Sequence, residues 1–146
     1  LVGRVVLNVN TARFARTLSI LTSSAVPILE GMMISGQVLS NEYMKLGVKE
    51  AADNVREGAS LKGSLEQTKI FPPMMLHMIG SGEKSGELEQ MLGRAAGNQE
   101  NELDSTLKIS LGLLTPMITL VMAGLVVFIL MAILMPIMEM NQLVGL

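Results

Sequence analysis

The last part of the chain is an unbroken run of uncharged residues from Ile109 to Met138. Sixteen of these 30 residues are Leu, Ile, Val or Phe, and they fall on all sides of a helix. A helix of ~20 apolar residues crosses the ~30 Å hydrocarbon core of a bilayer and satisfies its own backbone hydrogen bonds. The alternative is a buried helix of a soluble core, but a chain of 146 residues has too few partners to cover it. The pattern therefore predicts a transmembrane helix over 109–138.

Before this run, apolar residues recur at spacings of three and four, which predicts consecutive helices and almost no strand. Pro27 is expected at the first position of the second helix, with Glu30 in its first turn. Asn41 is a good N-cap for the third helix, and Gly58 ends it. The expected helices cover about 10–25, 27–39, 42–57, 60–69, 73–80 and 87 onwards.

The sixth helix is expected to be much the longest. A turn is predicted over Gly82-Glu83-Lys84-Ser85-Gly86 because this stretch is rich in glycine and polar residues. From Glu87 the helical pattern continues without a proline to Pro116. The predicted fold is therefore all-α, a bundle of about six helices whose last helix continues into the membrane as one rod, bent if anywhere near Pro116.

Charge gives this arrangement a direction. All eleven Lys and Arg residues lie between Arg4 and Lys108, and Glu139 is the only charged residue after Met138. Because basic residues stay on the cytoplasmic side of a membrane, residues 1–108 are expected in the cytoplasm and the tail 139–146 on the opposite side. Leu1 is not an initiator and no signal peptide precedes it, so we expect a C-terminal fragment of a longer protein.

Composition argues against several classes of function. The part before the apolar run is almost neutral, which gives no electrostatic footprint for nucleic acid. The chain has no cysteine, so neither disulfides nor thiolate chemistry are expected.

No constellation for catalysis stands out. His77 lies in an apolar stretch with no acid at metal-ligand spacing, and Gly80-Ser81-Gly82 meets neither phosphate-loop pattern. The carboxylates of the sixth helix are typical of a solvent-exposed helix face. We therefore expect no enzyme, no metal and no cofactor.

Small and weakly polar residues follow one face of the predicted transmembrane helix. Gly112, Thr115, Thr119 and Ala123 are separated by three, four and four positions. Such a stripe lets a second helix approach closely. Chance placement in a simple membrane anchor is the other interpretation.

The segment 71–88 resembles the signature of a known family. It reads FPPMMLHMIGSGEKSGEL and matches the pattern F-P-x-x-x-x-x-M-I-x-x-G-E-x-S-G-x-L. The pattern is that of the type II secretion system protein F family, also called general secretion pathway protein F, whose relatives include type IV pilus platform proteins. Matching residues include Arg13, Phe14, Pro27, Phe71, Pro72, Met78 and Leu88, together with the turn residues Gly82, Glu83, Ser85 and Gly86.

The resemblance implies that this chain is the second cytoplasmic domain and the last of three spans of a bacterial inner-membrane protein, with the tail 139–146 in the periplasm. It implies a non-enzymatic assembly platform that couples a cytoplasmic secretion ATPase to pseudopilus assembly. The implied partners are that ATPase, other inner-membrane secretion components, pseudopilins, membrane lipid and further copies of the protein itself. A type IV pilus platform is the nearest alternative, and a membrane-tethered enzyme or transporter subunit is a more distant one.

Overall fold

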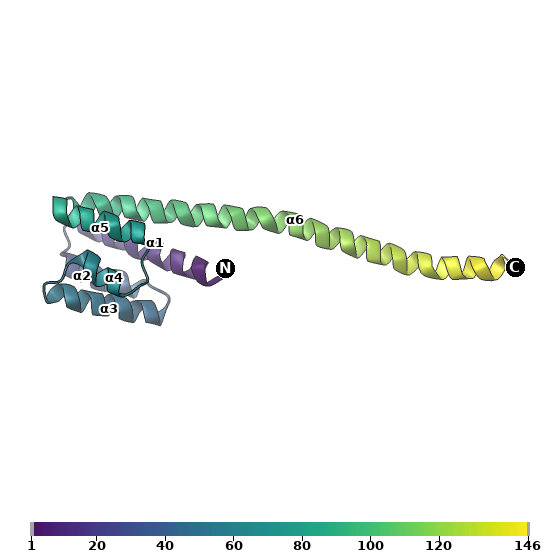
Figure 1. Cartoon of the computed structure of the whole chain (residues 1–146), viewed down its shortest axis with the longest axis horizontal. Coiled ribbons are helices and arrows are strands. Elements are labelled where there is room, and N and C mark those ends of the chain that lie inside the picture. The colour runs from purple at the N-terminus through teal and green to yellow at the C-terminus, as the bar shows by residue number, and fades with distance from the viewer. Residues whose placement is uncertain (1, 146) are drawn as a thin grey trace. The chain divides into compact units, whose positions relative to one another are not determined.

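A computed structural model describes residues 2–145, so residues 1 and 146 at the ends of the predicted domains lie outside the described part. The helices are α1 (Val2–Ser23), α2 (Ile28–Gln37), α3 (Glu42–Arg56), α4 (Leu61–Gln67), α5 (Pro73–Ser85) and α6 (Leu88–Val144) (Figure 1). No strand occurs between residues 2 and 145. The all-α prediction is confirmed.

The chain divides into two compact units, Leu1–Thr106 and Leu107–Leu146. The first unit holds α1 to α5 and the beginning of α6. Its core consists of 19 buried apolar residues, among them Phe14, Leu18, Met32 and Leu92, none of which is exposed to solvent. Burying a side chain of this size stabilises a fold by ~1.5–3 kcal/mol, so this core is what holds the first unit together.

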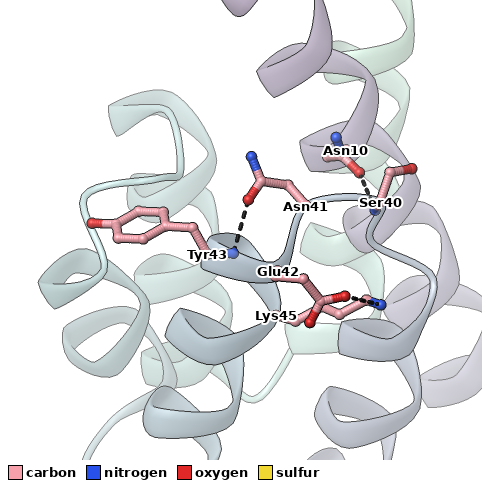
Figure 2. Close-up of polar contacts among 6 residues, drawn as sticks. All are labelled: Asn10, Ser40, Asn41, Glu42, Tyr43 and Lys45. Carbon is pink, nitrogen blue, oxygen red and sulfur yellow. Dashed lines mark hydrogen bonds and ion pairs between the residues drawn. The ribbon is translucent and has the colours of Figure 1, made fainter.

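Local signals set most of the helix boundaries. The Asn41 side chain accepts a hydrogen bond of 2.8 Å from the Tyr43 backbone N–H, and it caps α3 as predicted (Figure 2). Gly58 follows the end of α3 with a φ of 101°, which favours glycine. Pro27 is the N-cap of α2 and not its first residue, because its ψ of 142° is extended.

Two predicted boundaries are wrong. The first helix begins at Val2 and not near Asn10, because Val5, Val6 and Val9 extend its apolar pattern towards the N-terminus. The fifth helix does not end at Gly80 but continues to Ser85.

The predicted turn over Gly82–Gly86 is therefore mostly helix. Gly82, Glu83 and Ser85 belong to the last turns of α5, and only Gly86, with a φ of 77°, leaves the helix as its left-handed C-cap. Composition suggested a longer turn because two glycines flank three polar residues. Contacts made by Gly82 and Glu83 with other helices stabilise the helical conformation instead.

In the second unit, α6 continues through Pro116 and Pro136. This helix is long and apolar enough to cross a membrane, and none of its most apolar stretch is buried. That agrees with the composition of the predicted span.

Candidate functional site

Glu83 joins α5 to the start of α4. Its two carboxylate oxygens accept hydrogen bonds of 2.9 Å and 2.8 Å from the backbone N–H groups of Leu61 and Lys62. The first N–H groups of a helix have no partner within the helix, and an acidic group there also meets the positive end of the helix dipole. Ser60 caps the same helix through a bond from the Gly63 N–H to its hydroxyl. Glu83 therefore acts as a second N-cap supplied by a distant helix, and we call this arrangement the Glu83 cap.

Gly82 allows α5 to pack closely against the start of α6. A Cβ atom at this position would lie 2.9 Å from Leu88 Cα and 2.9 Å from Met91 Cβ. A neighbouring glycine, Gly80, makes room for the stem of Lys62, whose Cδ would lie 2.6 Å from an added Cβ. Gly82 is helical, so the reason for a glycine here is close contact and not an unusual backbone angle.

The two aromatic residues of the family pattern meet in the core. The rings of Phe14 and Phe71 have centroids 4.9 Å apart and are tilted by 47°. Aromatic pairs in this range stabilise a core beyond their buried area. Phe14 lies on α1 and Phe71 two residues before the start of α5, so the pair joins segments that are far apart in the chain.

The other matching residues have plain structural positions. Pro72 is the N-cap of α5, and Leu88 opens α6. Met78 and Leu88 are partly buried and pack against the core. The Arg13 guanidinium lies 3.4 Å from the Ser40 hydroxyl at the surface.

The sequence did not reveal an ion pair between α1 and α6. Arg16 and Glu100 form two hydrogen bonds of 2.7 Å each, and their side chains are 41% and 46% exposed. These hydrogen bonds lower the pKa of Glu100 and raise that of Arg16, against an opposing effect of burial. The partners are 84 positions apart, so no local spacing could have indicated the contact.

The side chains of the described residues form no candidate metal site. Residues 2–145 contain no cluster of three or more His, Asp or Glu side chains arranged to hold a metal. His77 is exposed and lies at a hollow with Lys62, Ser81 and Lys84, without an acidic partner there.

The predicted packing face of the span lies in the second unit. Gly112, Thr115, Thr119 and Ala123 are all exposed there. The Thr119 hydroxyl donates a hydrogen bond of 3.1 Å to the Thr115 carbonyl, which satisfies it within the helix. The face stays a prediction.

Known proteins match nearly all of this chain. The family described as "Type II secretion system (T2SS), protein F" matches residues 14–136. Type II secretion system protein F of Vibrio cholerae is 60% identical, and that of Aeromonas hydrophila 58%, in each case over 99% of this chain. Type IV pilus assembly protein PilC of Pseudomonas aeruginosa is 32% identical over 98% of it.

The chain spans only 36–38% of the length of these three relatives. The family match nevertheless covers the Glu83 cap, the Phe14–Phe71 pair and most of α6. This extent confirms the resemblance found in segment 71–88: the chain belongs to the type II secretion system protein F family.

Proposed function

We propose that this chain is part of the inner-membrane assembly platform of a type II secretion system. In this role it couples a cytoplasmic secretion ATPase to assembly of the pseudopilus. The observation that carries the proposal is the 60% identity to type II secretion system protein F over almost the whole chain. Identities to pilus assembly proteins are 28–32%, which favours secretion over the pilus alternative.

The physical basis of coupling is the continuity of α6. It begins beside the Glu83 cap at Leu88 and reaches Val144 without a break. A helix transmits displacement better than a flexible linker, whose ends move independently. In the proposed mechanism, motion of the helical bundle reaches the bilayer through the backbone of α6.

Flexible residues placed between the two units test this mechanism. Insertion of three glycines after Thr106 in the full-length protein should leave it in the membrane and abolish secretion. A matched pair replaces Ser105, Thr106 and Leu107 by three glycines or by three alanines. Both variants keep the length and register, but glycine weakens the helix by about 1 kcal/mol per residue relative to alanine. Normal secretion by the glycine-insertion variant and by the glycine-replacement variant would remove mechanical coupling through α6 from the proposal.

The proposed topology places residues 1–108 in the cytoplasm and the tail 139–146 in the periplasm. Lys108 flanks the apolar segment on one side, and no basic residue follows on the other. Because the chain has no cysteine, a single cysteine at Asn141 reports its side of the membrane directly. Labelling of intact cells by a membrane-impermeant maleimide is the expected result, and labelling only after lysis would reverse the topology.

Self-association through the small-residue face is also part of the proposal. Thr119→Leu would add bulk to the stripe formed with Gly112, Thr115 and Ala123, and association should weaken by about 1 kcal/mol. Leu120→Ile on a bulky face is the control. Crosslinking or analytical ultracentrifugation in detergent measures the change. Equal association of both variants and the parent would favour a simple membrane anchor.

A further inference from the structure

One end of the first unit exposes a group of apolar side chains. Val6, Leu7, Tyr43 and Met74 are 44%, 37%, 71% and 62% exposed. They come from the second turn of α1 and the first turns of α3 and α5, and we call them the apolar end. Tyr43 is the only tyrosine of the chain.

A shared hollow brings part of this group together. Val6, Leu7 and Tyr43 line a shared hollow of about 300 Å³ with Lys69 and Ile70. The Ser40 N–H donates a hydrogen bond of 2.8 Å to the Asn10 side chain, which holds the start of α3 against α1 (Figure 2). In Figure 2 the Tyr43 ring lies on the other side of the first turn of α3 from the Glu42–Lys45 ion pair. Its ring is thus available for a contact outside the chain.

The chain leaves the first unit at this same end. Going backwards along α1, Arg16 pairs with Glu100 and Val9 shares a hollow with Leu103, so α1 runs antiparallel to the first part of α6. The start of α1 is therefore directed towards Thr106.

Helix α5 runs in the same direction as α1. Gly82 lies against the start of α6 at Leu88, and Met78 Sδ lies 3.5 Å from the Asn98 side-chain nitrogen further along. The first turn of α5, with Met74, is therefore also directed towards Thr106.

The proposed span brings this end of the first unit close to the membrane. Only Leu107 and Lys108 separate Thr106 from Ile109, where the uncharged run begins. Even a fully extended chain covers at most ~3.6 Å per residue, so Ile109 lies within roughly 11 Å of Thr106 in any arrangement. This step rests on the proposed function, which places 109–138 in the bilayer.

The side chains at this end suit a bilayer surface. Tyrosine and aliphatic residues favour the region between headgroups and acyl chains, and basic residues attract anionic lipid. Arg4 and Lys69 are exposed there. We propose that the apolar end docks onto the cytoplasmic bilayer surface, with Tyr43, Leu7 and Met74 entering the headgroup region and Arg4 and Lys69 facing anionic phosphates.

Fluorescent labels at single cysteines test the docking. The whole chain is placed in vesicles of phosphatidylcholine and phosphatidylglycerol that carry a quencher at headgroup depth. Labels on Tyr43→Cys and Met74→Cys should be quenched several-fold more than one on Ile20→Cys, which is 56% exposed beside the opposite end of the bundle. All three sites are exposed, so the substitutions leave the core intact. Equal quenching at positions 43, 74 and 20 would overturn the proposal.

The basic residues give a second measurement. Removing both charges with Arg4→Gln and Lys69→Gln should lower the ratio of the docked to the undocked state of the apolar end about 25-fold. This corresponds to about fivefold for each residue. The loss should occur with phosphatidylglycerol and be absent in pure phosphatidylcholine. An effect of equal size in both kinds of vesicle would refute recognition of anionic lipid.

A third label separates this proposal from the proposed function. Leu120→Cys, read with a quencher at the bilayer centre, reports insertion of the span. Quenching at 120 without quenching at 43 would refute docking and leave the span intact, whereas no quenching at 120 would refute the span itself. Protection of position 43 in cells but not in vesicles would assign the apolar end to a protein partner and overturn docking to lipid.

Discussion

The two parts of α6 differ in how their apolar side chains are covered. Up to Thr106, Leu92, Ala95 and Ala96 are fully buried in the bundle, and the exposed residues of this part are all polar or charged. After Leu107 every described residue is exposed, with Leu120 at 72%. The width of the apolar stripe distinguishes the two parts, because one stripe is satisfied by a bundle whereas an apolar surface on all sides needs lipid or other helices.

The strongest test makes the same substitution in each part. Leu92→Ala removes a fully buried side chain and should destabilise the bundle by about 2–5 kcal/mol. Leu120→Ala removes an exposed side chain and should leave the bundle unchanged. Hydrogen exchange of the α1 amides in lipid nanodiscs measures both free energies of opening. Equal effects would mean that the two parts of α6 do not differ in this way.

Glycine substitutions locate where α5 holds the first part of α6. Gly82→Ala places a methyl group 2.9 Å from Leu88 Cα, and backbone cannot move aside as a side chain can, so we expect a cost of about 1–3 kcal/mol. Gly97→Ala is the control, because no atom lies within 4 Å of its added Cβ. It should stabilise the helix by up to about 1 kcal/mol. A neutral Gly82→Ala would show that this helix contact is looser than described.

The Glu83 cap gives a smaller expected effect. Glu83→Ala leaves the Leu61 and Lys62 N–H groups without this acceptor, and loss of a cap costs about 0.5–2 kcal/mol. Glu89→Ala, at an exposed position in the first turn of α6, is the control for lost charge. Faster exchange of the Leu61 and Lys62 amides in Glu83→Ala alone is the expected outcome. Unchanged exchange would contradict the capping role.

The smallest effect concerns the ion pair that joins α1 to the first part of α6. A double-mutant cycle with Arg16→Gln and Glu100→Gln should give a coupling of about 0.2–1 kcal/mol, because both side chains are partly exposed. The pKa of Glu100 is lowered in the folded state, so the contribution is complete above the ordinary Glu pKa of ~4.3 and disappears as the pH falls through the lowered value. Coupling that persists at pH ~2 would contradict this ionic origin.

Periodicity and capping residues predicted the helices well because these signals act over a few residues. Asn41 and Gly58 bound α3 as expected, and Pro73 begins α5. The prediction of a turn over 82–86 was wrong because the helical state of Gly82 and Glu83 depends on contacts with α4 and α6. No local sequence pattern describes these contacts.

The family signature indicated which residues of segment 71–88 matter, but it did not indicate the contacts that they make. The sequence placed Glu83 in a turn, whereas the structure shows its carboxylate as an N-cap of α4. The ion pair of Arg16 with Glu100 could not be predicted, because it depends on the packing of two helices far apart in the chain.

The Glu83 cap has a consequence for how the bundle opens. Helix α4 has only seven residues, too short to be stable alone in water, and two of its first N–H groups are satisfied by a carboxylate from α5. Loss of the last turns of α5 would therefore expose the start of α4 as well. The two helices should exchange amide hydrogens as one cooperative unit, and a slower opening of α4 than of the end of α5 would contradict this.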